Sequence, residues 1–110
     1  MSIFDETILN EEILKSNQFV NIGNNKWMTS WFANIKFKYR RPESCAVSII
    51  IDRYIYLSIF KVSIAISTKY GLYAKRMEIK DSIEFYTLLN QLKDIKYEYL
   101  TSEFLFATDK

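Results

Sequence analysis

The chain has 110 residues, of which 49% are apolar, so it is the size of one domain with one core and is not intrinsically disordered. It contains no His, one Cys and two Gly, which excludes imidazole catalysis, an intramolecular disulfide, a thiolate zinc centre and a glycine-rich phosphate loop. The formal net charge of +2 conceals a basic middle: residues 26–76 carry ten Lys or Arg and two acids, while residues 1–25 and 77–110 each carry a net charge of −3.

Hydrophobic periodicity and turn residues predict the elements in chain order. A short helix is expected at residues 5–16, with Asp5 as its N-cap. A hairpin is expected next, with strands at 19–22 and 26–32 around Gly23-Asn24-Asn25, because these three residues tolerate positive φ in a tight turn.

Further strands are predicted in the middle of the chain, at residues 34–41, 46–51, 54–60, 62–67 and 72–79. Residues 34–41 alternate apolar and basic side chains, which is typical of a half-buried strand with a basic outer face. Asp52-Arg53 is the expected turn between two apolar strands, and Tyr70-Gly71 marks another turn.

A second helix is predicted at residues 82–99. Asp81 and Glu84 have the spacing of a capping box. An apolar stripe of period 3.6 follows, formed by Phe85, Leu88, Leu89, Leu92, Ile95 and Tyr99. The tail at residues 101–110 is apolar around Phe104, so we expect it to dock either on this chain or on a second copy in a homodimer.

These elements predict a single domain over residues 1–110, of class α+β. A single antiparallel sheet of about five strands would carry a short N-terminal helix and a C-terminal amphipathic helix packed on it. The acidic start, with Asp5 and Glu6, lacks the basic region of a signal peptide. No stretch reaches the ~18 apolar residues of a spanning helix. We therefore expect a soluble, cytoplasmic protein that does not contact a membrane.

The sequence gives little support to catalysis. The acid clusters Glu11-Glu12 and Asp81/Glu84 lie at predicted helix positions, where solvated faces and caps explain them. Cys45 is expected to be a buried small hydrophobe, since nothing beside it in the sequence would lower its pKa. We expect no catalytic residues, no metal and no cofactor, and an enzyme that uses carboxylates stays a third hypothesis.

The basic residues suggest a binding surface. Lys36, Lys38 and Arg40 would share one strand face about 6.6 Å apart, close to the phosphate spacing of a nucleic-acid strand, with Arg41 beyond them. Neighbouring strands would add further cations and stacking rings: Lys61, Lys69, Lys75, Arg76, Tyr54, Tyr56, Tyr70 and Tyr73. A solvated face whose lysines deter edge pairing explains the same pattern. Trp31 is either a core residue or an interface anchor.

The chain resembles short accessory proteins of phages and prophages. The resemblance is carried by Leu14-Lys15-Ser16-Asn17-Gln18-Phe19, by Trp27 and the strands after it, and by Ile83-Glu84-Phe85 with Leu88-Leu89. It covers most of the chain, and it implies that the protein inhibits a host defence system, as anti-CRISPR proteins do. No functional residue carries over, because the shared positions are core positions. The order of strands then helix is also similar to Whirly-type and coactivator-type single-strand DNA-binding modules, at the level of topology alone.

Two functions therefore lead. The first is a non-enzymatic phage-type binding protein that inhibits a host defence nucleoprotein or nuclease effector, with the effector protein or its nucleic acid as partner. The alternative is an autonomous protein that binds single-stranded DNA or RNA. A structural virion protein also stays open.

Overall fold

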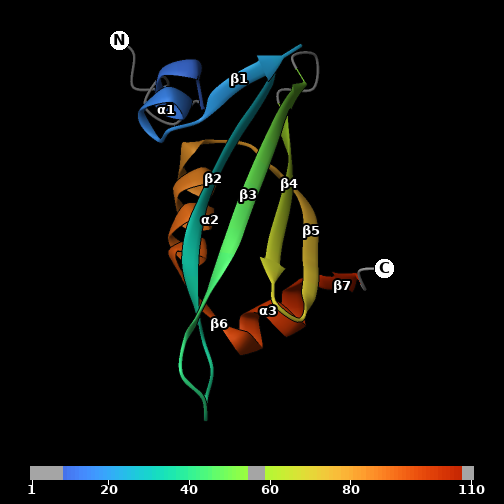
Figure 1. The fold of residues 1–110 in the computed structure, drawn as a ribbon. Helices are drawn as coiled ribbons and strands as arrows, with labels where there is room; N and C mark the ends of the chain where they lie inside the picture. The colour runs from blue at the N-terminus through green and yellow to red at the C-terminus, as the bar shows by residue number, and fades with distance from the viewer. Residues whose placement is uncertain (1–8, 55–58, 108–110) are drawn as a thin grey trace.

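A single sheet organises the molecule, and the computed structural model describes residues 9–54 and 59–107 of the chain (Figure 1). The elements in chain order are α1 (Glu11–Ser16), β1 (Val20–Gly23), β2 (Lys26–Lys36), β3 (Glu43–Tyr54), β4 (Ile59–Thr68), β5 (Gly71–Ile79), α2 (Ser82–Lys93), β6 (Asp94–Lys96), α3 (Tyr97–Glu103) and β7 (Leu105–Ala107). The strand order is β1-β2-β3-β4-β5-β7, all antiparallel, and β6 joins β2 in parallel. The predicted α+β class with one mainly antiparallel sheet is confirmed, with more strands and one more helix than expected.

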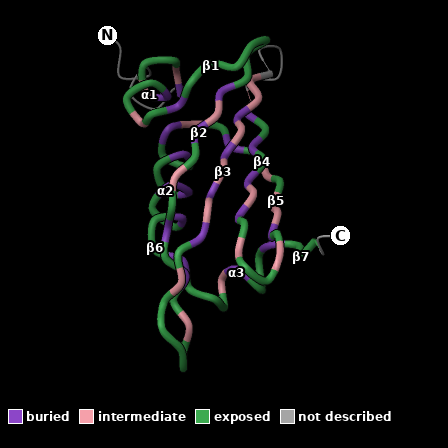
Figure 2. The backbone as a smooth tube through the Cα atoms, in the orientation of Figure 1, coloured by how far each residue is buried: buried purple, intermediate pink, exposed green. Residues whose placement is uncertain are grey.

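Alternation along the strands divides the sheet into two faces. In β3, Val47, Ile49 and Ile51 are buried, and the residues between them are partly exposed (Figure 2). The buried positions of β2–β5 form one core with the buried side of α2, including Phe85 and Leu92. We call this the inner face and the opposite one the outer face. The hydrophobic effect thus fixes which side of each strand faces the helices.

The central strands are longer than the sequence predicted. Residues 26–36 form one strand, and β2 ends before the expected end of the strand at 34–41. Asp52 and Arg53 do not turn, because they pair with Lys61 and Phe60 inside the β3–β4 ladder. Continuous pairing across β2, β3 and β4 holds these residues extended, which overrides their local turn preference. The connection at 55–58 lies outside the described residues.

The caps of the first two helices follow local chemistry. α1 begins at Glu11, where the Asn10 side chain accepts a hydrogen bond from the Ile13 amide at 3.0 Å. The expected cap, Asp5, lies outside the described residues. At α2 the predicted cap is confirmed, since the Asp81 carboxylate accepts from the Glu84 amide at 3.0 Å. The Glu84 carboxylate accepts from the Lys80 amide at 2.7 Å, which satisfies one more backbone donor.

The predicted continuous helix at residues 82–99 is wrong. α2 ends at Lys93, and residues 94–96 extend as β6 beside residues 34–36 of β2. Ile95 is fully buried in this extended conformation. An apolar residue at the helical spacing was therefore compatible with two conformations, and pairing with the edge of β2 selected the extended one.

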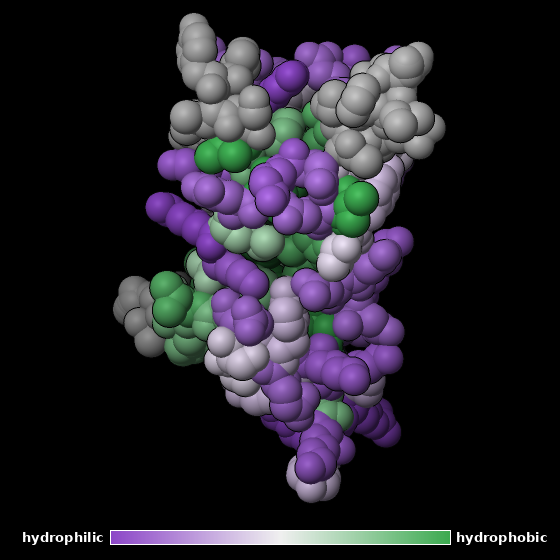
Figure 3. Space-filling view, turned by 180° about the vertical axis from the view of Figure 1, so that it is seen from behind, coloured by the Kyte–Doolittle hydropathy of each residue, from purple (hydrophilic) through white to green (hydrophobic). Residues whose placement is uncertain are grey.

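The tail docks on this chain. After α3, Phe104 is buried and β7 pairs with β5, where the ring of Phe106 lies 4.8 Å from that of Tyr73. Figure 3 views the molecule from behind; hydrophilic side chains cover most of it, and hydrophobic atoms lie beside the grey C-terminal residues. Residues 108–110 lie outside the described part of the chain. A homodimer through this tail stays a prediction.

The docking of α2 predicts a contrast in stability. Leu88→Ala should lower the free energy of unfolding by ~2–5 kcal/mol, because this buried side chain would leave a cavity in the core. Asn90→Ala, on the exposed side of the same helix, should change it by less than ~0.5 kcal/mol. Urea titrations followed by circular dichroism measure both, and equal small effects would contradict the docking.

Candidate functional site

The β2–β3 hairpin extends past the other strands at one end of the molecule (Figure 1). Contacts between distant segments bring basic and aromatic side chains together there. We call this end the basic tip. It consists of the cations Lys36, Lys38, Arg40, Arg41, Lys69 and Lys96 and the rings of Phe37, Tyr39, Tyr70 and Tyr97. Residues 37–42 connect β2 to β3, residues 69–70 connect β4 to β5, and residues 96–97 join β6 to α3. Three connections of the fold thus assemble one surface.

Arg40 links two of these connections. Its guanidinium carbon lies 4.2 Å from the centre of the Phe37 ring. Its Nη1 donates a hydrogen bond to the Tyr70 hydroxyl at 2.7 Å, across 30 residues of sequence. Phe37 in turn lies 5.0 Å from the Tyr97 ring. Stacking and hydrogen bonding therefore orient a cation that still has further donors to offer a ligand.

The tip is only partly neutralised. Lys36 pairs with Asp94 at 2.9 Å and Lys69 pairs with Glu43 at 3.2 Å. The hydrogen bond and the charge of Glu43 raise the pKa of Lys69 above its usual value. Among the described residues, no carboxylate lies within ion-pair distance of the other four cations, Lys38, Arg40, Arg41 and Lys96. Their uncompensated charge favours a negatively charged partner.

The predicted basic strand face is wrong in its geometry. Lys36 is the last residue of β2, and Lys38 and Arg40 lie in the connection beyond it. The alternation of apolar and basic residues continues past the point at which the ladder to β3 ends. The structure thus brings Lys36, Lys38, Arg40 and Arg41 together as a projecting tip, and their binding role stays a prediction.

Lys61 and Arg76 lie away from the tip. Both are on the outer face near the opposite end of the sheet, in a hollow of about 570 Å³. Lys61 stands in register between Asp52 and Glu78. Acidic neighbours on both sides therefore offset the charge of Lys61. Tyr54 pairs its backbone with Ile59, but its side chain and all of Tyr56 lie outside what the structure describes.

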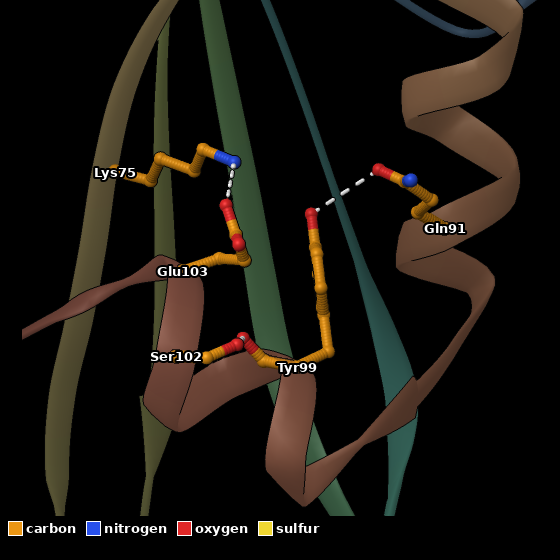
Figure 4. A network of polar contacts seen from close by, with 5 residues as sticks. All are labelled: Lys75, Gln91, Tyr99, Ser102 and Glu103. Carbon is orange, nitrogen blue, oxygen red and sulfur yellow. Dashed lines mark hydrogen bonds and ion pairs between the residues drawn. The ribbon is translucent and has the colours of Figure 1, made fainter.

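Lys75 has a structural environment on the inner face. Its ammonium lies 3.2 Å from Glu103 of α3 (Figure 4) and within 5.8 Å of the ring centres of Tyr99 and Phe104. The Tyr99 hydroxyl donates to Gln91 of α2 at 3.3 Å. Burial, and secondly the charge of Glu103, raise the pKa of Tyr99. Lys75 therefore helps to hold α3 on β5. Arg76, the next residue of the strand, points to the opposite face, so the two cations do not share a surface.

Trp31 lies at an open part of the β2 edge. β1 covers residues 26–28 and β6 covers residues 34–36 on that edge, so within the described chain residues 29–33 pair with β3 alone. The half-buried indole lines a hollow of about 340 Å³ together with Asn17, Gln18, Thr29, Ser30, Leu89 and Lys93. The sequence marked Trp31 as a candidate anchor, but only the pairing shows the open edge beside it.

Cys45 is enclosed in the core. It is 2% exposed, and its thiol donates to the Ala33 carbonyl at 3.3 Å. Burial raises the pKa of Cys45, and the hydrogen bond to Ala33 offsets this in part. No group of three potential metal ligands occurs among the described residues. These are the properties of a packing residue.

No protein-family model, curated protein or solved structure matches the chain in three separate comparisons. No described helix is long and apolar enough to cross a membrane. The fold and the tip together define a small α+β protein with a basic, aromatic surface at one end.

The enclosure of Cys45 predicts an unreactive thiol. In the native protein at pH 8, Ellman's reagent should modify Cys45 at least ~100-fold more slowly than in the urea-unfolded chain, since both access and the thiolate fraction are reduced. Stopped-flow absorbance gives the two rates. A native rate close to the unfolded rate would show that Cys45 is accessible.

Proposed function

We propose that this chain is a non-enzymatic, cytoplasmic binding protein that places its basic tip in an acidic groove of a nucleoprotein or nuclease effector and blocks it. This is the activity of a phage-type inhibitor of host defence. The observation that carries the proposal is the projecting tip, with four cations that have no carboxylate partner within the described chain. Such a tip is electrostatically complementary to an acidic protein groove.

The shape of the basic surface supports an effector site as the target. Proteins that bind single strands alone commonly combine a basic groove with stacking rings along it. Here the cations lie on a projection, and the outer face of the sheet carries Ser48 and Ala65 at its centre. A projection fits into the groove of a partner, whereas a strand of nucleic acid would find no basic groove along the described sheet.

Autonomous binding to single-stranded DNA or RNA is the second candidate, and one observation favours it. Tyr39 is 86% exposed and its ring centre lies 5.5 Å from the Lys38 ammonium, and Tyr70 is 52% exposed and its ring centre lies 5.4 Å from the Arg40 guanidinium. Exposed rings next to cations can stack on unpaired bases, at about 1–3 kcal/mol per base.

Reversal of the tip charge tests both candidates. Lys38→Glu/Arg41→Glu should abolish capture of the partner. If the chain binds a single-stranded oligonucleotide, its log affinity should fall linearly with log salt concentration. The same change should make the slope of that line less negative by about 0.7 for each phosphate that the tip no longer neutralises. Lys15→Glu/Lys80→Glu is the matched control, because it makes the same charge change at exposed sites outside both the tip and the hollow beside Trp31. Fluorescence anisotropy with a labelled oligonucleotide, from ~20 to ~300 mM salt, measures the slope. Equal behaviour of the two double variants would refute a role for the tip.

Trp31→Ala separates the two candidates. If the partner is a protein, the indole and the hollow beside it can provide an apolar anchor, and truncation should weaken the complex about tenfold or more. If the partner is nucleic acid bound at the tip, the same change should alter affinity by less than about twofold. Pull-down from nuclease-treated bacterial lysate at ~0.3 M salt, which screens exposed charge contacts, reports the first effect, and anisotropy reports the second.

A further inference from the structure

The outer face of the sheet carries no helix anywhere in the described part of the chain (Figure 1). Four cross-strand rows of side chains cover it from β2 to β5. From the end opposite the tip they are Lys26–Asp52–Lys61–Glu78, Met28–Ile50–Ser63–Arg76, Ser30–Ser48–Ala65–Ala74 and Phe32–Ala46–Ser67–Leu72. The third row consists of Ser and Ala alone, and the fourth has Ala46 and Ser67 between Phe32 and Leu72, so the middle of this part of the face is flat.

Large apolar side chains border this flat area. Phe32 is 78% exposed, Val20 on β1 is 64% exposed, and Leu105 on β7 is 79% exposed. Val20 faces the same side as its cross-strand neighbour Met28, and Leu105 faces the same side as Ala74. A contiguous surface of small and apolar side chains on an uncovered sheet is characteristic of an interface.

We propose that the outer face binds a second copy of this chain, about a two-fold axis that runs parallel to the strands between β3 and β4. In this arrangement β2 faces β5 of the second copy, and β3 faces β4. The result is a two-layer sandwich of sheets about 10 Å apart, with strand directions aligned apart from the twist.

The charged row provides the first argument for a second copy. Along Lys26, Asp52, Lys61 and Glu78 the signs alternate, positive then negative, over four positions. The two-fold axis reverses this order, so both cations of this row meet a carboxylate: Lys26 faces Glu78, and Asp52 faces Lys61. The complementarity depends only on the order of the signs, so it holds whatever contacts these side chains make within one copy.

The side-chain sizes in the other three rows also fit this axis. Ile50 faces Ser63 of the second copy, where the hollow of about 570 Å³ lies. Phe32 faces Leu72, and Ser48 faces Ala65, so in these two rows apolar side chains meet apolar ones and small side chains meet each other. In the second row Met28 faces Arg76, whose aliphatic stem can lie along it. An axis perpendicular to the strands would instead set the charged row against the row of Phe32. The charged side chains would then lose hydration without gaining partners of opposite charge.

The edges of the face fit as well. The axis brings Leu105 of the second copy to the outer side of β1, close to Val20. The same two-fold rotation therefore covers both of these exposed side chains. From the strand spacing and the rise per residue, the six strands offer on the order of 600 Å² on each copy, which reaches the lower limit of specific interfaces. We therefore expect a dimer with a dissociation constant in the micromolar range.

The axis has a consequence for the tip. Because it is parallel to the strands, it places the two basic tips at the same end of the dimer. If the tip acts as proposed above, the dimer would present two copies of it to one partner, which raises avidity. The pairing itself does not depend on the function of the tip.

Sedimentation equilibrium of the full chain without nucleic acid tests the pairing, from ~1 to ~500 μM, a range that brackets the expected dissociation constant. The wild type should shift from monomer to dimer. Ala65→Arg should be monomeric throughout, because it places two arginines near the axis. Ile83→Arg adds the same side chain at an exposed site on α2 and should dimerise like the wild type.

A charge swap provides a test that does not depend on packing. Asp52→Lys should raise the dissociation constant at least about tenfold, because it sets a lysine against Lys61 at two symmetry-related places in each dimer. Asp52→Lys/Lys61→Asp restores opposite signs and should return the constant to within about threefold of the wild type. Thermal melts at ~1 μM, where the monomer prevails, show whether each variant is folded.

A wild type that is monomeric at ~500 μM would overturn the proposal. So would a dimer that Ala65→Arg leaves intact, since association would then use another surface, such as the C-terminal tail. Failure of the charge swap to restore an association that Asp52→Lys had weakened would exclude the proposed axis. None of these outcomes bears on binding by the tip, which is measured separately.

Discussion

Burial of the inner face of β2–β5 against α2 is the interaction on which the rest of the structure depends. Val47, Ile49 and Phe85 are fully buried in this core. Each deeply buried apolar side chain contributes roughly 1.5–3 kcal/mol, and the alternation of the strands then decides the direction of every other side chain. The described helices are confined to one side, which leaves the outer face and the hairpin tip as the surfaces available to partners.

The tip follows from strand length. β2 and β3 form a longer hairpin than β4 and β5, so the residues that join β2 to β3 extend past the neighbouring turn. The Arg40 contacts with Phe37 and Tyr70 support this projection at its base. A cation held in place in this way loses less conformational entropy when it binds, which is the physical advantage of a preorganised site.

The two surfaces have different chemistry and suit different contacts. The tip is strongly charged and convex, so its interactions are long-range and sensitive to salt. The outer face is flat, with small side chains and a balanced row of charges, so it suits close packing between sheets. A protein of this size can therefore combine self-association through one surface with recognition through another.

The sequence by itself determined the α+β class and the cap at Asp81, and it marked the run from Lys36 to Arg41 as basic, because composition and capping are local patterns. It could not determine where the strands end or that Ile95 is extended, because those depend on pairing with distant residues. The sequence placed Lys75 and Arg76 in one patch, but the cross-strand register set them on opposite faces. Only the tertiary structure decided which charges meet, since a one-residue step along a strand reverses the face.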